Sequence, residues 1–345
     1  MPDSFFKRMM RTSPASVAAK LGLDRYRVAR LLGKRSRLTA EQSSLLAQMR
    51  ADNSVASAPF RATECWQEVC RIFDRHFYME GIGDVEAQYL NLRFSGFAPG
   101  DPRLHGYLVY TYFQLLRQRD IYDLLRRIRC APGRACLGYD FEGCNVSLDL
   151  LFSVDDFYSL LELRPDVLSE PLVVADIGAG WGRLGYVLKQ VNPSAAYVIF
   201  DLPEALLISS AYLPSVLPGV KHMSYMGSRG LPLLSRATLL GGGMWFLGSQ
   251  DLARVRAASV DMVVNIASFQ EMTEAQVRQY FEVISDKARG GHLFLKQLWS
   301  GRTHGHHLTE IAGYERYPFP PAWERVFLRN ATFSHAFFET GYRIR

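Results

Sequence analysis

Apolar runs alternate with helical patterns between residues 171 and 298. Strand-like runs occupy 172–175, 197–200, 244–247, 260–265 and 292–297, and helical spacing of apolar residues follows the first run at 184–188 and the fourth at 277–289. Strands that alternate with helices are typical of a parallel sheet covered on both faces. The pattern therefore predicts an α/β fold, and further apolar runs at 326–328 and 336–338 are expected to add strands.

The chain before residue 165 has a mainly helical pattern. Residues 14–50 predict three short helices, with Gly22 in the first turn and a capping box opening the third at Thr39. This arrangement is similar to a repressor-type helix-turn-helix, with Arg25, Arg27 and Arg30 facing outward. We favour a basic helical appendage over a DNA-binding unit, because helical hairpins with a glycine turn are common.

Residues 51–60 are small and polar, which predicts a linker. Helical spacing then recurs at 65–79 and 107–128, and we expect these helices to form a lid or a dimer surface over the carboxyl edge of the sheet. An irregular segment, 138–158, offers Ser153 or Asp155 as a helix N-cap. The predicted domains are 1–55 (basic helical), 56–165 (helical lid and substrate region) and 166–345 (cofactor-binding).

A glycine-rich turn follows the first predicted strand. Gly180-Trp-Gly182-Arg-Leu-Gly185 satisfies the spacing of a dinucleotide-binding turn, and Asp201 ends the second strand twenty-one positions after Gly180. Asp176, however, precedes the first glycine, where a pyrophosphate would meet like charge. S-adenosylmethionine carries a sulfonium and an ammonium and no phosphate. The two acids therefore favour S-adenosylmethionine over a nicotinamide dinucleotide.

Several stretches extend this prediction through a family resemblance. The runs DIGAGWGRLGYVL, FDLPEALLISSAYL, DMVVNIASFQEM and FLKQ, with NLRFSGFAPGDPRLHGYLVYTY upstream, resemble the sugar O-methyltransferase family of bacterial glycan and natural-product clusters. The resemblance covers about residues 85–345. It implies a Rossmann-like class I methyltransferase fold with a mostly parallel, seven-stranded sheet that the tail completes with antiparallel strands. It also implies S-adenosylhomocysteine as product and a sugar hydroxyl as acceptor.

The expected cofactor contacts lie at the carboxyl ends of the strands. Leu202 is expected to border the adenine ring, and Asp251 to accept from the adenine amino group as class I enzymes often arrange. The full set of predicted cofactor residues is Asp176, Gly178, Ala179, Gly180, Gly182, Arg183, Asp201, Leu202, Asp251, Asn265 and Ser268.

Methyl transfer to an alcohol needs alignment and a base. We predict Glu271 as this base, because it follows the fourth strand where the transferable methyl would lie, with Gln270 orienting the acceptor. The alternative is that Glu271 only holds its loop, with His222 or His292 as substitute bases. Phe269 and Tyr158 are predicted acceptor contacts. A non-sugar natural product or a peptide, or a DNA-binding regulator acting through residues 14–50, are the alternative functions.

Composition limits the partners. Net charge is +6, but residues 1–50 hold eleven Lys and Arg against three acids, so the remainder carries −2 and only the N-terminal segment would suit nucleic acid. No apolar run approaches a bilayer span and no signal peptide is recognisable, so a cytoplasmic protein is expected, with a homodimer as its assembly. A metal is not predicted: Cys130, Cys136 and Cys144 lack paired spacing, and the histidines at 304, 306 and 307 are read as a solvated loop.

Overall fold

The computed structural model is organised around one eight-stranded sheet. It describes residues 38–63, 66, 67, 69–71, 73, 74, 82, 102–130, 138–300, 311 and 313–345. The strand order is β5-β6-β4-β3-β7-β8-β10-β9. The strands are β3 Val173–Ile177, β4 Ala196–Asp201, β5 His222–Met223, β6 Met244–Gly248, β7 Met262–Ile266, β8 His292–Leu298, β9 Glu324–Asn330 and β10 Phe337–Arg343.

Six of these strands run parallel, and the tail closes the sheet antiparallel. β5, β6, β4, β3, β7 and β8 pair in parallel, whereas β10 pairs antiparallel with both β8 and β9. The predicted Rossmann-like α/β class and each predicted strand are confirmed. The expected count of seven strands was one too low, because the two-residue strand β5 pairs with the edge of β6.

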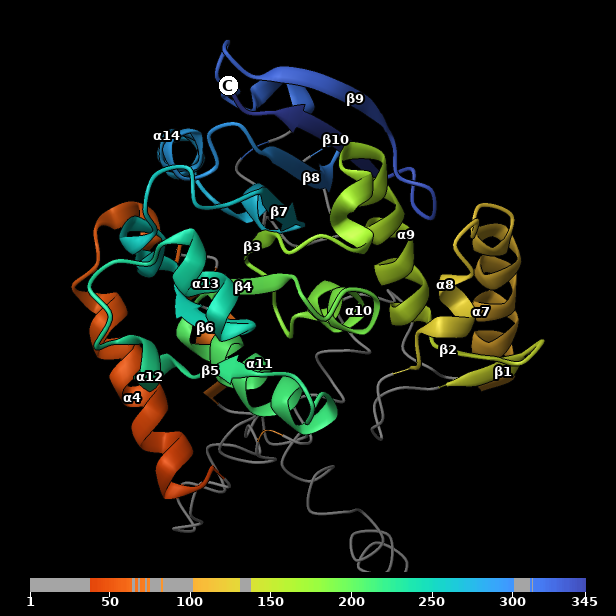
Figure 1. Ribbon diagram of the computed structural model, residues 1–345, viewed down its shortest axis with the longest axis horizontal. Helices are drawn as coiled ribbons and strands as arrows, with labels where there is room; N and C mark the ends of the chain where they lie inside the picture. The colour runs from red at the N-terminus through yellow and green to blue at the C-terminus, as the bar shows by residue number, and fades with distance from the viewer. Residues whose placement is uncertain are drawn as a thin grey trace, which may run out of the picture.

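Two hydrophobic cores lie on the two faces of the sheet. One face is covered by α9 (Leu148–Leu163), α10 (Arg183–Val191) and α11 (Pro203–Val216), and the other by α13 (Arg236–Gly242) and α14 (Glu274–Lys287). Figure 1 shows α9 and α10 on one side of the central strands and α14 beside β7 and β8. Because the strands are apolar on both faces, the sheet is buried throughout its centre, as parallel sheets require.

The remaining elements extend these cores. Helix α4 (Ala40–Ser54) lies beside α11, and α7 (Pro102–Arg117), α8 (Leu124–Arg127) and the hairpin β1–β2 (Tyr139–Phe141, Cys144–Val146) lie beside α9 in Figure 1. The short helices are η1 Ala58–Phe60, η2 Pro165–Leu168, η3 Ser249–Arg254, η4 Phe269–Glu271, η5 Tyr314–Arg316 and α12 Tyr225–Ser228. The division of the chain into three domains stays a prediction.

Three local predictions need correction. The helix expected over 107–128 is broken after Arg117, and Asp123 adopts a left-handed φ of 53° between α7 and α8. Residues 51–60 are not a linker, because α4 continues to Ser54 and Phe60 packs edge-on against Tyr280. The N-cap of α9 is Ser147 instead of Ser153 or Asp155. The capping box at Thr39 is confirmed, whereas residues 14–37 of the predicted helix-turn-helix lie outside the described residues.

Candidate functional site

The turn between β3 and α10 is shaped by three glycines with positive φ. Gly178, Gly180 and Gly182 have φ values of 72°, 63° and 84°, which side chains with a Cβ rarely adopt. A Cβ at Gly178 would lie 2.1 Å from the Ser268 Oγ, so the loop after β7 approaches the turn too closely for any side chain. The turn thus keeps bare backbone at the carboxyl edge of the sheet.

Asp201 fixes this turn from the tip of the neighbouring strand β4. Its Oδ2 accepts a hydrogen bond from the Gly180 N–H at 2.7 Å, and its Oδ1 accepts one from the Leu202 N–H at 2.7 Å. The predicted acid and the predicted glycine turn are therefore in direct contact. Because Asp201 ends its strand, its carboxylate lies at the edge where open α/β sheets bind ligands.

The two strand-end acids carry unusual electrostatics. Asp176 and Asp201 are both buried. Burial raises the pKa of Asp176 to about 7, although the Tyr197 hydroxyl donates to its carboxylate. Burial also raises the pKa of Asp201 to about 7, opposed by its two backbone donors and reinforced by the charge of Asp176. A cation at this edge would favour the ionised carboxylates, whereas a pyrophosphate would oppose them.

The loop after β7 is held by an amide network. The Asn265 Nδ2 donates to the Ile177 carbonyl at 2.7 Å, and its Oδ1 accepts from the Phe269 N–H and from the Gln297 Nε2 at 2.6 Å. The Gln270 Oε1 accepts from the Leu298 N–H at 2.8 Å. The Gln270 oxygen therefore joins η4 to β8, and the part of Gln270 in orienting an acceptor stays a prediction.

Three other predicted side chains have partners within the protein. Phe269 is fully buried among Tyr280 and Phe281, so it belongs to the core and cannot contact an acceptor. The Tyr158 hydroxyl donates to Asp120 at 2.5 Å and accepts from the Tyr122 N–H, which assigns it to the packing of α9 against the α7–α8 connection.

The third is Arg183, whose guanidinium lies 2.5 Å from Asp156 in a buried charge network. Lys296 on β8 lies 2.6 Å from the other oxygen of Asp156, and Arg119 lies 2.7 Å from Asp155. Burial alone would raise the pKa of Asp156, but Lys296 and Arg183 lower it below its ordinary value. The network joins α9, α10 and β8, and the charge of Arg183 also lowers the pKa of Asp176, so the cofactor role predicted for Arg183 stays a prediction.

Three carboxylates of this region lie close enough to suggest a metal site. Oxygens of Asp155, Asp156 and Glu339 lie within 4.8 Å of one another. The positive charges beside these carboxylates, however, come from side chains. Lys296 pairs with Asp156, Arg119 pairs with Asp155, and Arg329 lies 2.6 Å from Glu339. The cluster is therefore an ion-pair network.

Asp251, the residue predicted to contact adenine, lies in η3 directly after β6. Its Oδ2 accepts from the Gly248 N–H at 3.0 Å, and its Oδ1 lies 2.7 Å from Arg254. Both oxygens thus already stabilise η3. The adenine contact predicted for Asp251 remains a prediction.

The predicted substitute bases lie at the wrong edge. His222 begins β5 and His292 begins β8, so both are at the amino edge of the parallel strands, opposite the glycine turn. The prediction that His222 or His292 could act as a substitute base is therefore wrong. His304, His306, His307 and Cys136 lie outside the described residues, and Cys130 and Cys144 are free thiols.

The helix at 65–79 was expected over the carboxyl edge of the sheet, but sequence reasoning did not predict the partners of the N-terminal strap, which we define as the described residues between 50 and 74. Arg50 lies 2.8 Å from Glu204 after β4, and the Asn53 Nδ2 lies 3.3 Å from the Ser249 Oγ after β6. The Trp66 indole N–H donates to Glu271 after β7 at 2.7 Å. The strap therefore contacts the loops that follow three strands. Nothing in the local pattern of 50–74 signals these distant partners.

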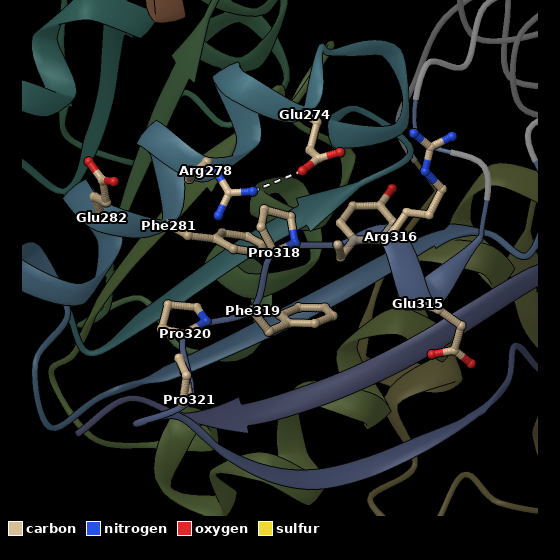
Figure 2. A pocket seen from close by; sticks show the side chains of 11 residues that line it. Glu274, Arg278, Phe281, Glu282, Glu315, Arg316, Pro318, Phe319, Pro320 and Pro321 are labelled. Atoms are coloured by element: carbon tan, nitrogen blue, oxygen red, sulfur yellow. Dashed lines mark hydrogen bonds and ion pairs between the residues drawn. The ribbon is translucent and has the colours of Figure 1, made fainter.

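A surface groove beside α14 lies apart from these residues. Figure 2 shows Phe281, on the helix, close to Pro318 of the proline-rich segment 318–321, and Arg278, which lies 2.8 Å from Glu274. None of the residues that line the groove is a candidate cofactor contact. The described helices also include none with the length and apolar character needed to cross a bilayer.

Comparison with known proteins gives distant structural likenesses. No family model matches the chain, and no curated protein matches it. Among solved structures, a SAM-dependent methyltransferase from Aquifex aeolicus is 16% identical, with 56% of this chain and 98% of that chain covered and a TM-score of 0.36. Magnesium protoporphyrin IX methyltransferase from Synechocystis PCC 6803 with bound SAH is 13% identical, with coverages of 70% and 98% and a TM-score of 0.39.

The pyocyanin biosynthetic protein PhzM is 15% identical over 56% of this chain, with a TM-score of 0.37. The matched region spans 55% of that protein's length. At such low identities and TM-scores, the order and direction of the strands remain the basis for the fold assignment.

Proposed function

We propose that this protein binds S-adenosylmethionine at the turn between β3 and α10 and transfers its methyl group to a hydroxyl of a small acceptor. The observation that supports this best is the hydrogen bond from the Gly180 N–H to Asp201. It joins the acid at the end of β4 to the glycine turn that follows the neighbouring strand β3. A second buried acid, Asp176, lies on the adjoining strand.

These residues suit S-adenosylmethionine better than a dinucleotide. The close approach of Ser268 to Gly178 leaves backbone where the amino acid part of the cofactor would lie. Asp201 can accept from two ribose hydroxyls, and the backbone at Leu202 would border adenine. When bound, S-adenosylmethionine supplies a methyl group activated by its positive sulfonium. Two carboxylates whose ionisation is disfavoured by burial would gain from that charge.

We assign Glu271 as the candidate base and a sugar or glycosylated metabolite as the preferred acceptor. Glu271 ends η4, directly after β7, at the same carboxyl edge as the glycine turn. A carboxylate there can accept the hydroxyl proton as the oxygen attacks the methyl carbon in line with the sulfur. The sugar rests on the family resemblance alone, and a non-sugar natural product or a peptide is the alternative acceptor.

Calorimetry with S-adenosylmethionine, S-adenosylhomocysteine and NAD⁺ tests the cofactor. We expect the first two to bind and NAD⁺ not to bind; NAD⁺ binding alone would overturn the proposal. Transfer of labelled methyl to a panel of monosaccharides, nucleotide sugars and phenols tests the acceptor. Glu271→Gln should keep the affinity for S-adenosylmethionine and reduce transfer by about 100-fold, a typical contribution of a general base. Full transfer by this variant would remove Glu271 from the chemistry.

A further inference from the structure

The side chain of Glu271 is held by a residue 205 positions away in sequence. The Trp66 indole N–H donates to the Glu271 Oε2 at 2.7 Å. A glutamate side chain has several rotatable bonds, so ordering its carboxylate has an entropic cost that a specific donor offsets. This contact joins the N-terminal strap to the loop after β7.

The same turn of the strap also holds the backbone of Glu271. The Thr63 Oγ1 donates to the Glu271 carbonyl at 3.2 Å and accepts from the Trp66 N–H at 3.3 Å. Thr63 and Trp66 thus form one local unit that contacts both the main chain and the side chain of Glu271. A two-point contact of this kind fixes the carboxylate more tightly than a single hydrogen bond would.

The strap itself is anchored on both sides of this unit. The Gln276 Nε2 on α14 donates to the Arg61 carbonyl at 3.0 Å, just before Thr63. After Trp66, the Cys70 thiol donates to Glu204 on α11 at 3.1 Å, and Arg50 lies 2.8 Å from the same carboxylate. The indole is therefore presented by a segment that is fixed to two different helices of the catalytic sheet.

The donor chemistry of the pair suits a base. An indole N–H can only donate, so it recognises the oxygen of a carboxylate and cannot itself take a proton from an acceptor. It favours the ionised form of the glutamate, which is the form that accepts a proton.

We propose that Trp66 is a positioning residue, which with Thr63 holds the Glu271 carboxylate in the orientation needed for methyl transfer. This inference rests on the proposed function, since it gives Trp66 its role through Glu271. It assigns to the N-terminal strap a direct part in the reaction.

The test compares Trp66→Phe, which removes the N–H and keeps an aromatic ring, with Trp323→Phe. The Trp323 indole donates to the Ser285 Oγ at 3.1 Å, far from Glu271, and so provides the matched control. In full-length protein labelled with ¹³C-glutamate, the Glu271 signal is identified by its loss in Glu271→Gln. We expect its proton affinity to rise about tenfold in Trp66→Phe, which is a pKa higher by about one unit, and to stay unchanged in Trp323→Phe.

The kinetic readout uses the acceptor found in the labelled-methyl panel. In Trp66→Phe, the acid limb of the rate should move to higher pH by the same tenfold factor, while S-adenosylmethionine affinity is unchanged. An unaltered Glu271 titration, or an altered titration with an unmoved acid limb, would overturn the positioning role. Failure of the proposed function is distinguishable, because it appears as lost S-adenosylmethionine binding in the wild type or as full transfer by Glu271→Gln.

Discussion

Replacing Asp201 by asparagine should weaken cofactor binding and stabilise the unliganded protein. In the wild type, both carboxylate oxygens accept backbone hydrogen bonds at 2.7 Å. In the variant, an NH₂ group replaces one carboxylate oxygen and faces a backbone N–H. The asparagine side chain therefore cannot accept hydrogen bonds from two ribose hydroxyls. A lost hydrogen bond to a charged group costs roughly 1.5–3 kcal/mol. Two such losses predict that the Kd for S-adenosylmethionine rises by about 100-fold or more.

The stability of the unliganded protein should change in the opposite direction. The pKa of Asp201 is about 7 in the folded state against an ordinary value of 3.8. Because the folded pKa is the higher one, the stability that this group contributes is complete below pH 4 and is lost as pH rises through 7. A difference of about 3 pKa units corresponds to roughly 4 kcal/mol at most. Asparagine removes this loss, so the variant should unfold at a higher temperature than wild type at pH 8.

Calorimetry and thermal unfolding at pH 8 measure both effects, with Asp261→Asn as the matched control. Asp261 also accepts a backbone hydrogen bond at 2.7 Å, from the Val173 N–H, but at the opposite edge of the sheet. The control should leave the Kd unchanged. An Asp201→Asn protein that bound S-adenosylmethionine within threefold of wild type would refute the assignment of this edge as the cofactor site.

Three further results are expected. Gly178→Ala should abolish S-adenosylmethionine binding and lower the melting temperature, because its Cβ would lie 2.1 Å from the Ser268 Oγ; retained affinity would contradict this reading. Lys296→Met should lower the free energy of unfolding, measured in urea at pH 7, by about 3–5 kcal/mol, because it removes a cation 2.6 Å from buried Asp156. The affinity for S-adenosylmethionine should rise from pH 6 to pH 8 in calorimetry, because the two strand-end acids, with pKa values of about 7, become ionised; a flat profile would contradict it.

Local signals predicted the sheet and the turn well. Apolar runs marked β3, β4, β6, β7 and β8 to within two residues at each end, because buried strands need continuous hydrophobic sequence. The glycines and Asp201 were predicted to meet because parallel strands deliver their carboxyl ends to one edge, and the hydrogen bond from Gly180 to Asp201 agrees with that. These features depend on the spacing of residues within one short part of the sequence.

Features that depend on long-range contacts were not predictable in this way. Phe269 follows a strand as an acceptor contact would, but the aromatic side chains of α14 enclose it. Arg183 lies in the glycine turn by sequence, yet its partner Asp156 comes from a helix 27 residues earlier. The helix predicted over 107–128 ends at Arg117, and Asp123, just before α8, takes a left-handed backbone conformation that propensity does not reveal.

The N-terminal strap is translated well before the residues that it contacts. Arg50, Asn53 and Trp66 leave the ribosome before their partners Glu204, Ser249 and Glu271, which lie 154, 196 and 205 residues further along the chain. Domains are made from the N-terminus onward, so this first part of the site to be translated cannot complete its contacts until β7 and η4 have been made, while β8, β9 and β10 are still to come. The nascent protein therefore lacks the completed carboxyl edge of the sheet until that point.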